Sequence, residues 1–156
     1  MNFKHLFAAT LALSAFAHAA DTPGSNPSVA APNVNQRLAQ ARQAIAASDW
    51  TRAMAELNQA VREEPRNADV HNLLGYSWRK RATPDLAKAF EHYQTALRLQ
   101  PRHKGAHEYI GEAYLMDRKP AEAEKHLAQL EAICGNRTCE EYADLAKAIA
   151  DYKARN

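Results

Sequence analysis

The two cysteines are the side chains of this sequence with the most distinctive chemistry. Cys134 and Cys139 bound the short segment CGNRTC. Two thiols this close can form a disulfide, whereas free thiolates could take part in redox chemistry or metal binding. The spacing is not C-x-x-C, and two thiolates alone do not complete a zinc site. We expect a disulfide, and a thiol-handling or metal-handling role of Cys134 and Cys139 is the alternative.

Histidines and carboxylates gather earlier in the chain, before the two cysteines. His103 and His107 are four residues apart, and Glu108 and Glu112 follow. A histidine pair at this spacing can hold a metal ion on one helix face, but HEYIG lacks the second histidine of H-E-x-x-H. His107 also has a counterpart in His71, 36 residues earlier, which favours a packing role for both. We therefore predict no metal site and no cofactor.

The other polar side chains show no catalytic pattern. Ser77 and Thr95 stand alone in helical segments, and His92 and His126 are interpreted as ordinary helix residues. The sequence contains no readable nucleophile elbow, phosphate-binding glycine loop or convergent carboxylate pair. We expect a protein without catalytic activity.

The N-terminus has the organisation of a secretory signal. Lys4 precedes an apolar run from Leu6 to Ala17, and Ala17-His18-Ala19 fits a small-x-small cleavage site. The run has about 12 apolar residues where a membrane span needs about 20. We interpret residues 1–19 as a cleaved signal peptide of bacterial type. This predicts a periplasmic or secreted protein with no stable membrane insertion after cleavage.

The following segment, residues 20–33, has three prolines and no apolar period, which predicts a flexible leader. Beyond it the composition favours helices, because alanine is abundant and the whole chain has only 5 glycines. The chain has 20 Lys and Arg against 18 Asp and Glu, a net charge of +2. This near balance argues against a nucleic-acid partner, which would require a basic stripe.

The chain repeats itself with a period of about 36 residues. The segment HNLLGYSW, residues 71–78, aligns with HEYIGEAY, so that Gly75 matches Gly111. An alanine-rich helical segment follows each of them, and DWTRAMAELNQAVREEP is an earlier copy of that second half. Two helices joined by a tight turn make one helical hairpin. The sequence predicts three such hairpins, over residues 34–66, 67–102 and 103–136.

These copies resemble the tetratricopeptide repeat, whose signature is W-x2-L-G-x2-Y, then A-x3-F, then P. The resemblance implies an all-α solenoid in which Gly75 and Gly111 lie where the two helices of one hairpin cross. Within the turn of the second copy, Thr83 is expected to cap the next helix, with Pro84 as its first residue. The first helix of the first copy departs most from the pattern and could serve as a polar N-terminal cap.

A seventh helix is predicted in the C-terminal segment, residues 137–156. The residues Tyr142, Leu145, Ile149 and Tyr152 share one face, and Thr138 with Glu141 matches a capping box. Repeat arrays need a terminal helix to cover the apolar face of the last hairpin. We assign this role to the C-terminal helix.

Stacked hairpins form a curved array with a concave face. The resemblance implies that outward residues of the first helix of each hairpin line this face and hold a peptide or helix of a partner protein. The expected groove residues are Arg42, Asn72, Tyr76, Arg79, Glu108, Tyr109, Glu112 and Met116. The sequence thus predicts a non-catalytic interaction or scaffold module. Self-association into a homo-oligomer is a further possibility.

Overall fold

A computed structural model describes residues 31–156 of the chain. In this part the backbone forms seven α-helices and no strands, so the all-α fold predicted from the sequence is confirmed. The signal peptide and almost all of the leader lie outside the described residues. The helices are α1 (Val34–Ala46), α2 (Trp50–Glu63), α3 (Ala68–Lys80), α4 (Leu86–Leu99), α5 (Lys104–Met116), α6 (Pro120–Cys134) and α7 (Glu140–Arg155).

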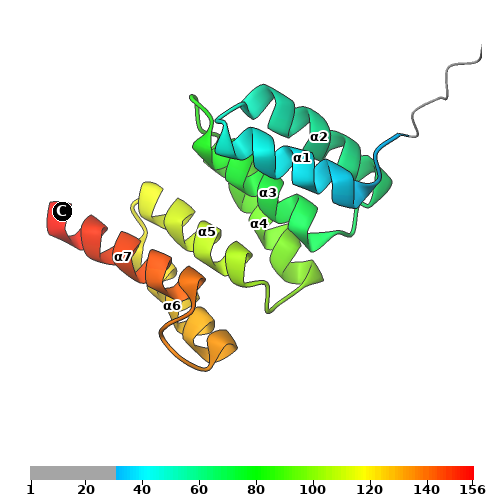
Figure 1. Cartoon of the computed structure of the whole chain (residues 1–156). Helices are drawn as coiled ribbons and strands as arrows, with labels where there is room; N and C mark the ends of the chain where they lie inside the picture. Colours follow the sequence, from blue (N-terminus) through cyan, green and yellow to red (C-terminus); the bar gives the residue numbers. More distant parts are fainter. Residues whose placement is uncertain (1–30) are drawn as a thin grey trace, which may run out of the picture. The chain divides into compact units, whose positions relative to one another are not determined.

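The helices pair as three hairpins, α1 with α2, α3 with α4 and α5 with α6 (Figure 1). The first helices of the hairpins also contact one another, α1 with α3 and α3 with α5, and α7 continues this row beside α5. Within residues 31–156, the second helices α2, α4 and α6 make no such contacts with one another. The row α1, α3, α5 and α7, here called the inner layer, is therefore more tightly packed than the row of second helices. For this reason the array curves toward the inner layer, and the surface of that layer that faces away from α2, α4 and α6 is the concave face.

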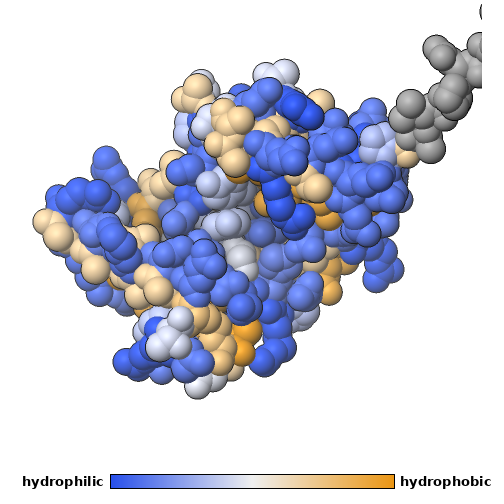
Figure 2. Space-filling view, in the orientation of Figure 1, coloured by the Kyte–Doolittle hydropathy of each residue, from blue (hydrophilic) through white to orange (hydrophobic). Residues whose placement is uncertain are grey.

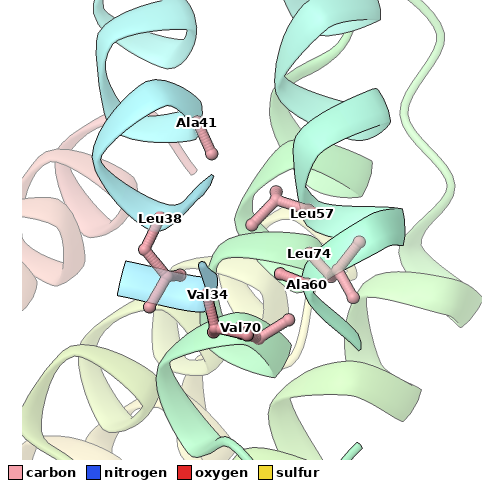
Figure 3. Packing of buried hydrophobic residues seen from close by; sticks show 7 residues of the cluster. All are labelled: Val34, Leu38, Ala41, Leu57, Ala60, Val70 and Leu74. Carbon is pink, nitrogen blue, oxygen red and sulfur yellow. The ribbon is translucent and has the colours of Figure 1, made fainter. Parts of the chain in front are cut away.

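The hydrophobic core is a chain of local clusters, each shared by neighbouring helices. In the first cluster, Val34 and Leu38 of α1 and Leu57 of α2 meet Val70 and Leu74 of α3 (Figure 3). All five side chains are at most 5% exposed. The next two clusters are built in the same way around α4 with α5 and around α5, α6 and α7. Stability in such an array comes from nearest-neighbour interfaces.

Side chains of the preceding loops cap most of the helices. Asn33 forms a capping box with Gln36 at the start of α1, and Asp85 accepts a hydrogen bond from the backbone N–H of Lys88 at the start of α4. The expectation that Thr83 caps this helix with Pro84 as its first residue is therefore wrong. The physical reason is that Asp85, a strong N-cap residue, stands two positions later and ends the longer loop.

The first helix of the first copy is as regular as the others despite its polar residues. Arg37 occupies a position where the repeat signature suggests an apolar residue, and its guanidinium pairs with Glu56 at 3.0 Å and Glu63 at 2.8 Å on α2. Charged pairing between the two helices thus accompanies the apolar contacts of α1.

Both signature glycines lie at close helix crossings, but with different partners. A Cβ on Gly75 would stand 2.6 Å from the ring of Tyr93 in α4, the second helix of the same hairpin, as expected. A Cβ on Gly111 would stand 2.7 Å from Leu145, which belongs to α7. The closest neighbour of Gly111 therefore comes from the C-terminal helix and not, as expected, from α6, the second helix of its own hairpin.

The helix α7 covers the last hairpin, and its Leu145 and Ile149 are buried. Its predicted capping box is wrong. Cys139 is the N-cap residue, and no side chain caps there; Thr138 instead donates its hydroxyl hydrogen to Asn136 at 2.9 Å. In residues 31–156 no helix has both the length and the apolar character needed to cross a membrane.

Candidate functional site

Two tyrosines from successive hairpins meet on the inner layer. Tyr76 of α3 and Tyr109 of α5 have ring centroids 4.7 Å apart, and both rings are partly buried. The guanidinium carbon of Arg79 lies 5.3 Å from the Tyr76 ring centroid and 5.8 Å from that of Tyr109. Tyr76, Tyr109 and Arg79, three of the eight predicted groove residues, thus form one cation–aromatic cluster that joins α3 to α5.

Arg79 is the anchor of this cluster and is only 5% exposed. Its Nε donates a hydrogen bond to the hydroxyl of Tyr93 at 3.3 Å, and its guanidinium pairs with Glu112. Burial raises the pKa of Tyr93 far above the usual range, so this phenol stays neutral. A buried guanidinium with such partners is held in one orientation, which presents its face to the two tyrosine rings.

Two further predicted groove residues are buried polar groups. Glu108 is 8% exposed, and within residues 31–156 its carboxylate has no hydrogen bond or ion pair. Burial, reinforced by Glu112 and Asp144, raises the pKa of Glu108 to about 8. Asn72 is 6% exposed, and its Oδ1 has no partner. The Asn72 oxygen is enclosed, so of these two side chains the Glu108 carboxyl is the one that leaves hydrogen-bonding capacity for a bound ligand.

Two hollows lie along the inner layer. The surface on this side of the molecule is mostly hydrophilic (Figure 2). The first, of about 250 Å³, is lined by Arg42, Ile45, Ala46, Leu73, Tyr76 and Tyr109. The second, of about 360 Å³, is lined by Arg79, Lys80, Glu112, Leu115, Met116, Ala148, Asp151, Tyr152 and Arg155. Six of the eight predicted groove residues therefore line one or other hollow.

The contribution of α7 to the second hollow was not foreseen from the sequence. Tyr152 and Arg155 line it opposite Arg79, although the capping role of this helix suggested only burial. The spacing of the apolar positions places Tyr152 on the buried face of α7, and in the structure it packs against the cluster of Leu145 and Ile149 and also lines this hollow. Met116, 47% exposed, stands at the edge of this hollow and is the only exposed large hydrophobic side chain of residues 31–156.

A third hollow lies away from the inner layer. It has a volume of about 610 Å³ and lies between α2 and the loop after α3, where Trp50, Met54 and Arg81 are among its lining residues. It is open and contains none of the predicted groove residues. It gives a natural comparison surface for experiments on the inner layer.

The family model named Tetratricopeptide Repeats-Sensor matches residues 7–116, which is more than two thirds of the chain. The chain belongs to this tetratricopeptide repeat (TPR) family. The match begins in the segment outside the described residues and ends at the last residue of α5, so α6 and α7 lie beyond it. No curated protein matches the chain in sequence. TPR domains are in general non-catalytic modules for protein–protein interaction, which fits a face with hollows and half-buried aromatic side chains.

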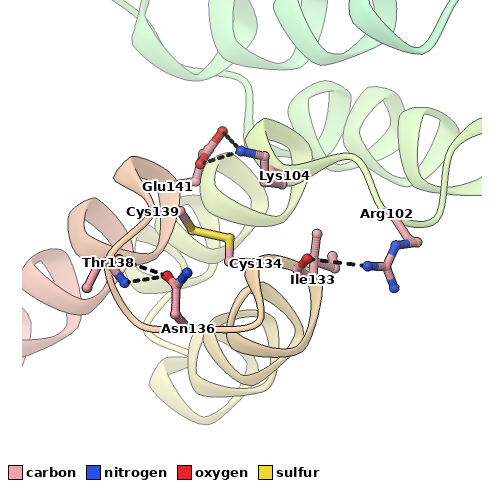
Figure 4. Close-up of a disulfide and its surroundings, with 8 residues drawn as sticks. All are labelled: Arg102, Lys104, Ile133, Cys134, Asn136, Thr138, Cys139 and Glu141. Carbon is pink, nitrogen blue, oxygen red and sulfur yellow. Dashed lines mark hydrogen bonds and ion pairs between the residues drawn. A yellow bond between two sulfur atoms is a disulfide. The ribbon is translucent and has the colours of Figure 1, made fainter.

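The cysteine pair of the TPR chain forms a disulfide between the end of α6 and the start of α7 (Figure 4). The Cα atoms of Cys134 and Cys139 are 6.3 Å apart. Ligand atoms of both cysteines and of Glu141 lie within 4.8 Å of one another, but bonded sulfurs supply no thiolate for a metal. Lys104 of α5 pairs with Glu141 at 3.1 Å, which adds a second tie between α7 and the last repeat.

The histidines of the TPR array occupy two kinds of position. His103 caps α5, since its Nδ1 accepts a hydrogen bond from the N–H of Ala106 at 3.1 Å, and its Nε2 lies 3.0 Å from a carboxylate oxygen of Asp69. His107 turns away to the second helix of its hairpin and is 6% exposed. The packing role expected for His107 therefore agrees with the structure.

The interpretation of His92 and His126 as ordinary helix residues is wrong. His71 lies against His92, and His107 against His126, with Nδ1 atoms 3.1 Å and 2.9 Å apart. The periodic signature of the repeat did not reveal these pairs, because each joins a residue of the first helix to one of the second across the hairpin.

Proposed function

We propose that this chain is an exported interaction module whose inner layer holds an extended or helical segment of a partner protein. The observation that carries this proposal is the cluster of Tyr76, Tyr109 and Arg79, which joins two hairpins between two hollows. Aromatic and arginine side chains supply a large part of the binding energy at protein interfaces. The cluster is held in place by Tyr93 and Glu112 before any partner arrives, so little ordering is needed on binding.

An unpartnered polar group near this cluster favours a peptide backbone as the ligand. Within residues 31–156 the Glu108 carboxyl makes no side-chain hydrogen bond or ion pair, and its pKa is raised to about 8, so it holds a proton near neutral pH. A protonated carboxyl can accept a hydrogen bond from a peptide N–H and donate one to a peptide carbonyl. A bound peptide would contact the tyrosine rings with its side chains and this carboxyl with its backbone.

The proposed location is the periplasm or the cell exterior. The signal-like N-terminus and the disulfide support this proposal. Disulfides persist mainly in oxidising compartments. The intact mass of the exported protein should correspond to a chain that starts at Ala20 or Asp21. A mass that includes Met1 would show that the N-terminal segment is retained.

The alternative, a thiol-handling or metal-handling accessory protein, requires free thiols at Cys134 and Cys139. The disulfide favours the interaction module. Labelling of freshly isolated native protein with a thiol reagent separates the two proposals. We expect no labelling, whereas modification of both cysteines would favour the accessory role.

A pair of variants tests the groove directly. Arg42 and Arg52 are both exposed, but Arg42 lines the first hollow and Arg52 lies on α2 away from both inner-layer hollows. We expect Arg42→Glu combined with Tyr76→Ala to reduce recovery of crosslinked envelope partners at least about tenfold. The control Arg52→Glu should leave recovery unchanged.

Thermal melting of each variant must accompany this measurement, because a partly unfolded protein would also lose its partners. Arg79 is left intact, since truncation of this buried residue would strand Glu112 and the Tyr93 hydroxyl. Full recovery by a well-folded groove variant would contradict the proposal. If the recovered partner is a second copy of the chain, its mass and the oligomeric state in solution will show it.

A further inference from the structure

The two hollows of the inner layer follow one another across the row of helices. Residues of α1, α3 and α5 line the first, and residues of α3, α5 and α7 line the second. The cluster of Tyr76, Tyr109 and Arg79 lies between them, because both tyrosines line the first hollow and Arg79 lines the second. A segment that fills both hollows therefore crosses the helices and does not run along one of them.

The first hollow is mainly apolar. Its walls are Ile45, Ala46 and Leu73 together with the two tyrosine rings, and Arg42 is its one charged lining residue. Such a site gains free energy by removing an apolar side chain of the ligand from water. It fits one aliphatic or aromatic side chain.

The second hollow differs from the first in its charged lining residues, which are Arg79, Lys80, Glu112, Asp151 and Arg155. Both carboxylates already have partners, since Glu112 pairs with Arg79 and Asp151 pairs with Lys147 at 2.6 Å. Lys80 and Arg155 are exposed and make no ion pair with any of residues 31–156. Two cations from different helices thus remain available on this hollow.

The surroundings do not use up the donors of Lys80 and Arg155. Both residues stand in the last turns of their helices, where the helix dipole favours cations, but this interaction occupies no N–H group. The raised pKa of Glu108 keeps that carboxyl protonated near neutral pH. Asp144 and Glu141, the carboxylates beside Glu108 on α7, line neither hollow.

We propose, on the basis of the function proposed above, that the bound segment is an extended peptide with an apolar side chain in the first hollow and an Asp or Glu side chain between Lys80 and Arg155. The carboxylate complements the two available cations. An extended backbone also leaves N–H and C=O groups for the Glu108 carboxyl, whereas the middle of a helix has none free.

The arrangement of the hollows sets the spacing of these two ligand residues. The middle helix of the three that line each hollow is α3 for the first and α5 for the second. Neighbouring helix axes lie about 8–10 Å apart, and an extended chain advances about 3.3 Å per residue. The apolar and the acidic residue should therefore stand about three positions apart.

Selection of random linear peptides on the exported chain tests this proposal. The peptides are displayed with their C-termini fused to a carrier, so that only side chains supply carboxylates. We expect the enriched peptides to hold an apolar and an acidic residue about three positions apart. With Lys80→Glu combined with Arg155→Glu, a basic residue should replace the acidic one. The control Arg52→Glu with Arg62→Glu makes the same charge change at exposed residues of α2 and should select the native motif.

A binding measurement with one enriched peptide, synthesised with an amidated C-terminus, gives the second readout. Replacing its acidic residue with the neutral amide should weaken binding to the native chain about threefold or more at low ionic strength. The same replacement should not weaken binding to the folded Lys80→Glu and Arg155→Glu variant.

The two proposals fail in different ways. Enriched peptides without an acidic residue, or the same acidic motif selected by the charge-reversed variant, would overturn the inferred ligand and leave the groove in place. If the native chain enriches no peptide beyond those enriched by a folded Tyr76→Ala variant, the groove itself is contradicted, and the inferred ligand with it.

Discussion

Gly75 of α3 lies directly against the ring of Tyr93 in α4, and a Cβ atom at this position would stand 2.6 Å from two ring carbons. Tyr93 is fully buried, and its hydroxyl accepts the hydrogen bond from Arg79. The ring therefore cannot move aside without disturbing the groove cluster. Glycine costs about 1 kcal/mol relative to alanine in a helix, and the close approach of Tyr93 explains why the sequence accepts this cost.

We predict that Gly75→Ala lowers the free energy of unfolding by about 1–3 kcal/mol, the usual range for overpacking. Gly105→Ala is the matched control, since a Cβ there would first meet the flexible amide of Asn72, at 3.1 Å. It should be close to neutral. Urea unfolding of both variants checks this, and equal stabilities would show that Tyr93 does not restrict position 75.

The disulfide should stabilise the C-terminal helix more than the rest of the array. Replacing Cys134 and Cys139 with serine should lower stability by about 2 kcal/mol on the chain-entropy estimate for so short a loop. Hydrogen exchange should increase first in α7, where Leu145 and Ile149 cover the last hairpin. A uniform increase over all seven helices would contradict this local role.

The buried carboxyl of Glu108 should make stability depend on pH. Its pKa is raised from 4.5 to about 8 in the folded chain, mainly by burial, so the folded state holds a proton that the unfolded state releases. The stability linked to this proton is fully present below about pH 4.5 and is lost as the pH rises through about 8. We expect Glu108→Gln to remove this loss. Urea unfolding of the native protein and of the variant from pH 5 to 9 measures this loss of stability. Parallel stability profiles for the two proteins would contradict the raised pKa of Glu108.

The repeat could be predicted from the sequence because its signals are local. Periodic apolar residues such as Val70 and Leu74 identify helices, and Gly75 identifies a close crossing. The glycine signal carried no information on which helix makes the crossing. Gly111 meets Leu145 of α7 because the C-terminal helix occupies the place of a next first helix.

Helix caps were harder to predict than helices, since they depend on how a loop folds. Thr138 and Glu141 have the spacing of a capping box, but Asn136 accepts the hydrogen bond from the Thr138 hydroxyl. Asp85 takes the place expected for Thr83 because the loop after α3 is longer than the other hairpin turns. A pattern of four residues does not reveal such competition between neighbouring polar side chains.

The candidate groove was predicted in part. The sequence places Tyr76 and Tyr109 on corresponding helices, and the structure brings their rings together through the contact of α3 with α5. The burial of Arg79 and its link to Tyr93 depend on packing between helices. Helical periodicity does not give that packing, so the sequence did not separate anchoring residues from exposed ones.

Site-specific photo-crosslinking tests the central claim, that the inner layer binds a partner, most directly. A photoreactive amino acid replaces Met116, at the edge of the second hollow, or Gln129, an exposed residue of α6 away from the hollows. We predict that position 116 gives a discrete adduct in the native envelope, that Tyr76→Ala abolishes it in a folded protein, and that position 129 gives none. An adduct of the same partner at position 129, or one at 116 that persists with Tyr76→Ala, would contradict the account.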